Sequence, residues 1–311
     1  MKDQAQKLRE IVDNMKKKNH LDVVPHVPPS DEQGNSTKNA RVIAITSGKG
    51  GVGKTNLTIN LGLALNQLGY KVVILDADLG LANIDVIVGV IPQFTLAHVI
   101  RREKTLKEII IEGPNGIQII SGGSGLKELV HLSEDQLVYL IESLKEIGRN
   151  ADFILIDTGA GINQSILSFV NAASEIILIS TPEPTSITDA YAMIKNIVWA
   201  DKEKSIKVLI NRASSSQEGI EIFDKLNAAA QKFLNVSLSR LGYLYEDPYV
   251  SKSVRFQTPF LLKYPESLAS QGVKAIAERL IDESKEEFDK NNGLQTFLHK
   301  IFSRYYLYRK K

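Results

Sequence analysis

The sequence predicts an α/β fold in which a doubly wound, mostly parallel sheet carries helices on both faces. Short apolar runs such as VVIL, FILI and IILI recur along the chain, and stretches with helical periodicity separate them. Continuous runs of Val, Ile and Leu are typical of parallel strands that are covered on both faces. Because strand and helix alternate, right-handed crossovers would wind such a sheet in both directions.

The expected elements follow this alternation from residue 41 onward. Seven apolar runs are expected to form strands, at Arg41–Thr46, Lys71–Asp76, Gly116–Ser121, Phe153–Asp157, Ile176–Ser180, Lys207–Asn211 and Ser239–Leu244. Apolar residues at helical spacing between them predict helices at Asn56–Leu68, Ser133–Ile147 and Gln217–Phe233. A further helix is expected to start within Thr181–Ala190, because the two prolines there suit a helix start.

The composition is that of a globular protein, and it excludes several kinds of chemistry. The chain has 311 residues, of which 43% are hydrophobic and 24% charged, so it can build a large core. It has no cysteine, which excludes disulfides, thiolate zinc sites, iron–sulfur clusters and a cysteine nucleophile. We find neither a secretory signal nor a run of about 18 apolar residues, so we expect a cytoplasmic protein without a membrane span.

Charge and composition divide the chain into four segments. Residues 1–20 are expected to form a basic amphipathic helix, residues 21–39 a flexible linker, residues 40–290 the α/β domain and residues 291–311 a second basic amphipathic helix. The net charge of +2 therefore hides a mildly acidic body between two basic ends. A protein that binds DNA would more often have a basic body, so we expect no specific DNA binding.

A glycine-rich loop, TSGKGGVGKT, follows the first strand and leads into the first helix of the domain. It fits the P-loop pattern, in which backbone N–H groups hold phosphate oxygens at a helix N-terminus. Lys54 is expected to reach the β and γ phosphates, and the Thr55 hydroxyl to bind Mg²⁺ directly. The expected nucleotide-binding residues of this segment are Gly48, Lys49, Gly50, Gly51, Val52, Gly53, Lys54, Thr55 and Asn56.

A second lysine, Lys49, lies early in this loop. With it, KGGVGKT resembles the deviant Walker A motif of the MinD/ParA family of P-loop ATPases. The resemblance implies that the protein binds ATP and ADP with Mg²⁺, and that it forms, with ATP, a homodimer in which Lys49 acts on the nucleotide of the partner subunit. A cation that arrives only on dimerisation couples a slow ATP hydrolysis to assembly.

Other site residues are assigned through the same resemblance. Within LDADLGLANID, Asp78 would orient the attacking water, and Asp76 would hold water on Mg²⁺, as would Asp157 in FILIDTGAG. Asn211 would bind adenine, and Pro248 would line the other side of the base. The segment TPEPTSITDA, with Glu183 and Asp189, would lie near the dimer or partner face, although a simple helix start explains it equally well.

Two further features resemble the flagellar number regulators of the FlhG type, also called YlxH or FleN. The sequence DQAQKLR occupies residues 3–9, and Gly159 replaces the proline that most MinD-like proteins have. The resemblance implies that the first helix stimulates the GTPase FlhF, with Gln4 reaching its nucleotide site. Flagellar switch-complex proteins are further partners that the resemblance implies.

The C-terminal segment combines an apolar stripe with basic residues. Leu294, Phe297, Leu298, Ile301, Phe302 and Tyr305 share one helix face, and Lys300 and Arg304 lie opposite. This pattern suits reversible binding to an anionic membrane surface, where two helices of a dimer bind better than one. The alternative is a terminal helix that packs on its own domain.

Other functions remain open for this sequence. A MinD-type cell-division ATPase or a ParA-type partition ATPase would have the same fold. A bacterial tyrosine kinase would fit the cluster Tyr305, Tyr306 and Tyr308, but those tyrosines belong to a basic amphipathic helix. A scaffold without hydrolysis is disfavoured, because the expected catalytic residues Lys49, Lys54 and Asp78 are all present.

Overall fold

The structure is a computed structural model that describes residues 40–78, 84–123 and 134–282, and seven residues between 293 and 301. The chain divides into a first unit, Met1–Thr37, which lies outside the described residues, and a second unit, Lys38–Lys311. The expected N-terminal helix and linker, including Gln4, therefore lie outside the description, as do Phe302 and Arg304.

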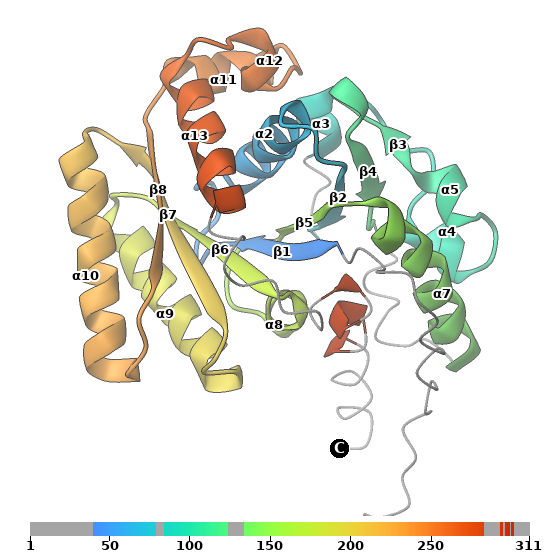
Figure 1. The fold of residues 1–311 in the computed structure, drawn as a ribbon, viewed down its shortest axis with the longest axis horizontal. Helices are drawn as coiled ribbons and strands as arrows, with labels where there is room; N and C mark the ends of the chain where they lie inside the picture. The colour runs from blue at the N-terminus through green and yellow to red at the C-terminus, as the bar shows by residue number, and fades with distance from the viewer. Residues whose placement is uncertain are drawn as a thin grey trace, which may run out of the picture. The chain divides into compact units, whose positions relative to one another are not determined.

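The described residues form one sheet of eight strands in the order β3-β4-β2-β5-β1-β6-β7-β8 (Figure 1). All neighbouring pairs are parallel except β3 and β4, so the expected doubly wound, mostly parallel sheet is confirmed. The strands are β1 Arg41–Thr46, β2 Val72–Ala77, β3 Ile111–Glu112, β4 Gln118–Ser121, β5 Phe153–Thr158, β6 Glu175–Ser180, β7 Ser205–Ala213 and β8 Ser239–Tyr245.

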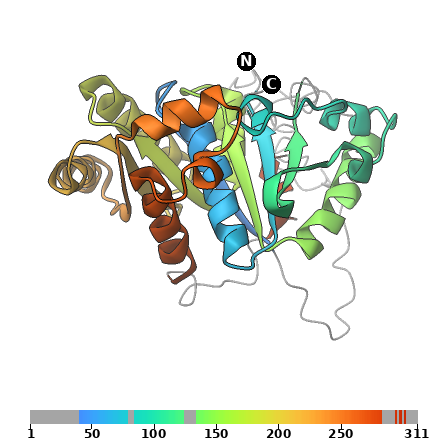
Figure 2. The same ribbon diagram turned by 90° about the horizontal axis from the view of Figure 1, so that it is seen from above.

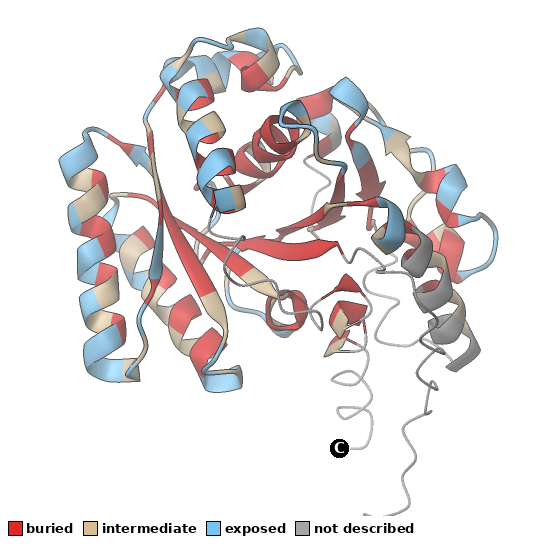
Figure 3. Ribbon diagram, in the orientation of Figure 1, coloured by how far each residue is buried: buried red, intermediate tan, exposed pale blue. Residues whose placement is uncertain are grey.

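Helices cover both faces of the sheet, and each face has its own core. Val42 and Ala44 of β1 belong to one core, whereas Ile43 and Ile45 belong to the other, as alternating strand residues must. Figure 1 shows α2 and α13 on one side of β1 and α8 on the other, and Figure 2 shows the strands side by side behind α2. The strands β1, β2 and β5 are buried along their length (Figure 3).

The described helices have the following bounds. They are α2 Lys54–Gln67, α3 Ile84–Val88, α4 Leu96–Ile100, α5 Leu106–Ile109, α7 Glu134–Asn150, α8 Gln164–Ala172, α9 Pro184–Ala200, α10 Ser216–Leu234, α11 Pro248–Arg255, α12 Phe260–Lys263 and α13 Leu268–Asp282. None of the described helices is both long enough and apolar enough to cross a membrane.

The expected strand at Gly116–Ser121 begins later than the sequence pattern indicates. Pro114–Gly116 form a 3₁₀ turn in which Asn115 has a φ of 56°, so the strand β4 starts only at Gln118. The antiparallel edge strand β3 was not expected, because its two residues are too short to give a periodic signal. The other six strands lie within two residues of their expected bounds.

The described part of the C-terminal segment packs on its own domain. Leu294, Phe297, Leu298 and Ile301 are buried in the core on the α7 and α8 side of the sheet. The ring of Phe297 lies 6.4 Å from that of Phe169 on α8, measured between centroids. Leu294 lies against Gly148 of α7, where a Cβ would come within 3.1 Å of it. The four described residues of the expected apolar stripe therefore face the protein in this structure.

Candidate nucleotide-binding site

The glycine-rich loop connects the central strand β1 to α2 at the carboxyl edge of the sheet. Gly51 and Gly53 have φ angles of 77° and 100°, a left-handed conformation that favours glycine. The helix α2 begins at Lys54, and no side chain caps its first N–H groups. These N–H groups have no acceptor within the helix, so they and the helix dipole can bind an anion.

Two glycines of the loop are also required for steric reasons, because their neighbours leave no room for a side chain. A Cβ at Gly48 would overlap the backbone carbonyl of Asp189 in α9. A Cβ at Gly53 would lie 2.5 Å from the Nδ2 atom of Asn211 on β7. The loop is therefore packed between the strand β7 and the helix α9.

The expected carboxylates meet at this edge. Asp76 on β2 and Asp157 on β5 are register partners on adjacent parallel strands, and both are buried. Asp76 Oδ1 accepts a hydrogen bond of 3.1 Å from the backbone N–H of Asp78, so the third acidic residue lies beside the carboxyl end of β2. The structure thus brings together the three acidic residues that the sequence singled out.

Burial dominates the electrostatics of Asp157 and Lys54. Desolvation raises the pKa of Asp157 to about 6, although hydrogen bonds from Thr55 and Thr58 and the charge of Lys54 oppose the rise. Desolvation likewise lowers the pKa of Lys54, against the attraction of Asp157 and Asp78. Both shifts arise because charged groups lose hydration here, and bound phosphates and Mg²⁺ would replace that hydration.

Orphaned polar atoms show that the site fits a nucleotide with Mg²⁺. Three buried oxygens at this edge have no hydrogen-bond partner within the described residues, namely Thr46 Oγ1, Asn56 Oδ1 and Thr181 Oγ1. Thr46 ends β1, Asn56 lies in the first turn of α2, and Thr181 follows β6. Mg²⁺ prefers oxygen ligands, so the Thr55 hydroxyl could bind it directly and Asp76 and Asp157 through water.

The side chain of Lys49 binds residues at the start of α9. Its Nζ atom donates hydrogen bonds to Glu183 Oε2 at 2.6 Å and to Thr185 Oγ1 at 3.0 Å. This ion pair holds the pKa of Glu183 below its usual range. The sequence left Glu183 either near a dimer or partner face or in a simple helix start, and it did not identify Glu183 or Thr185 as a partner of Lys49.

Asn211 and Pro248 lie at the ends of adjacent parallel strands. Asn211 lies near the carboxyl end of β7, and Pro248 begins α11 three residues after the last residue of β8. The side chain of Asn211 donates a hydrogen bond of 2.7 Å to the carbonyl of Val52, and its Oδ1 accepts one from the N–H of Arg212. One amide hydrogen and one lone pair remain available, so the residue can still bind the edge of a base.

The fold and the site define a P-loop nucleotide-binding protein, and comparison with known proteins gives its family. A family model described as ParA, NUBPL iron-transfer P-loop NTPase, matches residues 38–281. The chain belongs to this ParA family of P-loop NTPases, and it is an ATPase that also resembles MinD.

Its relatives include an antiactivator and a flagellum site-determining protein. The chain is 45% identical to the antiactivator FleN of Pseudomonas aeruginosa over 249 residues, which cover 80% of this chain and 89% of FleN. It is 34% identical to the flagellum site-determining protein YlxH of Helicobacter pylori over 267 residues, covering 85% and 90% of the two chains. The solved structure of MinD with Mg-ADP from Pyrococcus horikoshii matches with a TM-score of 0.62 and 28% identity, covering 79% of this chain and 97% of that one.

Proposed function

We propose that this ATPase controls the number or placement of flagella by cycling between a monomer and an ATP-bound dimer. The observation that carries the proposal is the 45% identity with the antiactivator FleN, which extends over 80% of the chain. The similarity to YlxH supports it, because that protein is named as determining the flagellar site. Replacing the chromosomal copy with the Lys54→Ala variant should change the number of flagella per cell, counted by electron microscopy, and an unchanged number would contradict the proposal.

Hydrolysis is proposed to need the dimer, with Lys49 moving from Glu183 to the phosphates of the partner subunit. Lys49 is partly exposed, so a partner surface can reach it. In size-exclusion chromatography with ATP and Mg²⁺, the Asp78→Ala variant should accumulate as a dimer, because Asp78 is proposed to orient the attacking water. A variant that stays monomeric, or hydrolyses ATP at the wild-type rate, would remove this assignment.

Reversible membrane association is proposed for the ATP state. The apolar side chains of Phe297, Leu298 and Ile301 are buried in this structure, so they must leave the domain before they can enter a bilayer. With anionic liposomes, the protein should sediment in ATP and stay in the supernatant in ADP. Binding in both states, or binding that survives deletion of residues 294–311, would contradict this.

A separate proposal concerns the N-terminal residues, which match the motif through which FlhG-type proteins stimulate FlhF. A peptide of residues 1–20 should accelerate GTP hydrolysis by FlhF, and the same peptide with Gln4→Ala should not. Equal rates with the two peptides would assign the effect to another residue, and no acceleration by either would exclude the interaction.

A septum-positioning ATPase is the second candidate, because a MinD relative from Oltmannsiellopsis viridis is 34% identical over 85% of the chain. In that case the Lys54→Ala strain should form minicells while its flagella stay normal. A partition ATPase should shift a DNA duplex in a gel at physiological salt. Iron transfer does not follow from the family description, because the 311 residues contain no cysteine to hold an iron–sulfur cluster.

A further inference from the structure

The end of β7 has an irregular backbone next to the phosphate loop. The register between β7 and β8 shifts between Ile210 and Ala213. Within this shift Arg212 has a φ of 60°, in the left-handed region that a non-glycine residue adopts only at a cost. Such a conformation persists only where contacts with the surrounding structure stabilise it, and Arg212 makes such contacts with the phosphate loop.

Two consecutive side chains of this irregular segment hold two consecutive carbonyls of the loop. Asn211 Nδ2 donates to the carbonyl of Val52 at 2.7 Å, and Arg212 Nη2 donates to the carbonyl of Gly51 at 2.9 Å. The backbone N–H of Arg212 donates to Asn211 Oδ1 at 3.0 Å, which fixes the orientation of that amide. The left-handed turn at Arg212 thus allows neighbouring residues to reach the same loop.

We propose that Arg212 is a positioning residue that prepares the phosphate loop for the nucleotide. In a trans peptide the C=O and the following N–H point in opposite directions. The carbonyls of Gly51 and Val52 belong to the same peptide units as the N–H groups of Val52 and Gly53. Holding both carbonyls from the β7 side therefore turns both N–H groups to the opposite side, where a loop of this kind binds phosphate oxygens.

The same guanidinium links the loop to the Lys49 ion pair. Its charge contributes to the lowered pKa of Glu183, after the larger effect of Lys49. A second explanation of Arg212 would be general attraction of the phosphates by an exposed positive charge. The two explanations differ, because a hydrogen bond to a neutral carbonyl is insensitive to salt, whereas attraction by an exposed charge is screened.

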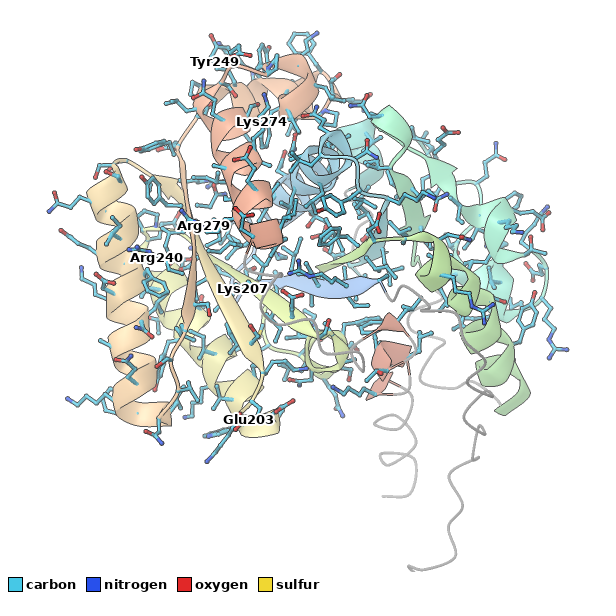
Figure 4. The ribbon with its side chains drawn as sticks, in the orientation of Figure 1. Glu203, Lys207, Arg240, Tyr249, Lys274 and Arg279 are labelled. Atoms are coloured by element: carbon cyan, nitrogen blue, oxygen red, sulfur yellow. The ribbon has the colours of Figure 1, made fainter. Side chains whose placement is uncertain are left out.

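The test compares ADP binding by Arg212→Gly, Arg212→Ala and Arg240→Ala, measured by titration with a fluorescent ADP. Glycine tolerates the left-handed backbone, so Arg212→Gly loses the hydrogen bond without adding strain and should keep the wild-type melting temperature or exceed it. Arg240→Ala is the matched control, because it removes the same charge from the start of β8, away from the loop (Figure 4).

Both Arg212 variants should bind ADP about five- to tenfold more weakly, at 0.1 M and at 0.5 M KCl alike, whereas Arg240→Ala should bind within twofold of wild type. An effect that disappears at 0.5 M KCl would assign Arg212 to charge attraction and overturn the proposal. ADP affinity of Arg212→Gly within twofold of wild type would overturn it as well.

Discussion

At the scale of single residues, the buried carboxylate of Asp157 makes the stability of the nucleotide-free protein depend on pH. Burial raises its pKa to about 6 from the usual 3.8. Between these values the folded protein binds more protons than the unfolded chain, so the free energy of unfolding falls as pH rises through the window, by about 3 kcal/mol in all. The variant Asp157→Asn stays neutral and should lose this part of the pH dependence.

Melting temperatures of wild type and Asp157→Asn, measured without nucleotide from pH 4 to pH 7, check the expectation. The variant should be the more stable of the two at pH 7 and nearly equal near pH 4. Parallel curves would show that Asp157 ionises in the folded protein as it does in the unfolded chain.

A second prediction at this scale separates the steric role of a loop glycine from phosphate binding. Gly48→Ala places a methyl group against the backbone of Asp189, so it should destabilise the nucleotide-free protein by about 1–3 kcal/mol. Gly50→Ala is the control, because its Cβ would meet only the Cβ of Ala160, at 3.7 Å. Denaturant unfolding without nucleotide compares them, and equal stability of the two variants would contradict the packing argument.

At the scale of elements, the C-terminal helix is held by apolar packing. Phe297→Ala should release it, since removing a buried phenylalanine costs about 3–5 kcal/mol. Trypsin should then cut after Lys300 faster than in wild type, as followed by mass spectrometry. The exposed Phe256, on α11's side of the domain, gives the control variant Phe256→Ala, which should leave the rate unchanged. Equal rates in both variants would show that other contacts hold the helix.

At the scale of the whole molecule, the ion pair of Lys49 and Glu183 opposes the proposed dimer. Both side chains are partly exposed, so the pair is weak. Glu183→Gln should therefore tighten the ATP-dependent dimer about two- to fivefold. Analytical ultracentrifugation with ATP measures this. Glu203→Gln is the control, because Glu203 (labelled in Figure 4) lies between α9 and the amino end of β7, whereas the glycine-rich loop lies at the carboxyl ends of the strands. A weaker dimer would instead place Glu183 in contact with the partner.

Much of the fold could be predicted because its signals are local. The strands β1, β2 and β5 are buried on both faces, and their continuous runs of apolar residues predict this burial. The two-residue strand β3 could not be predicted, because it depends on its pairing with β4. The turn before β4 has a local signal in Pro114, Asn115 and Gly116, so the expected strand should have begun after them. The left-handed backbone of Arg212 could not be predicted either, because the residues around it in the sequence give no signal for that conformation.

The sequence by itself determined the phosphate loop, the carboxylates Asp76, Asp78 and Asp157, and the apolar stripe of the C-terminal helix. The loop and the stripe follow from residue type and spacing within one short segment, whereas the roles of the three carboxylates are what the resemblance to the MinD/ParA family implies. Only the tertiary structure decided that Lys49 pairs with Glu183, that Arg212 holds the loop, and that the stripe faces the domain. These contacts join segments more than a hundred residues apart, and which of them form depends on how the sheet and helices pack.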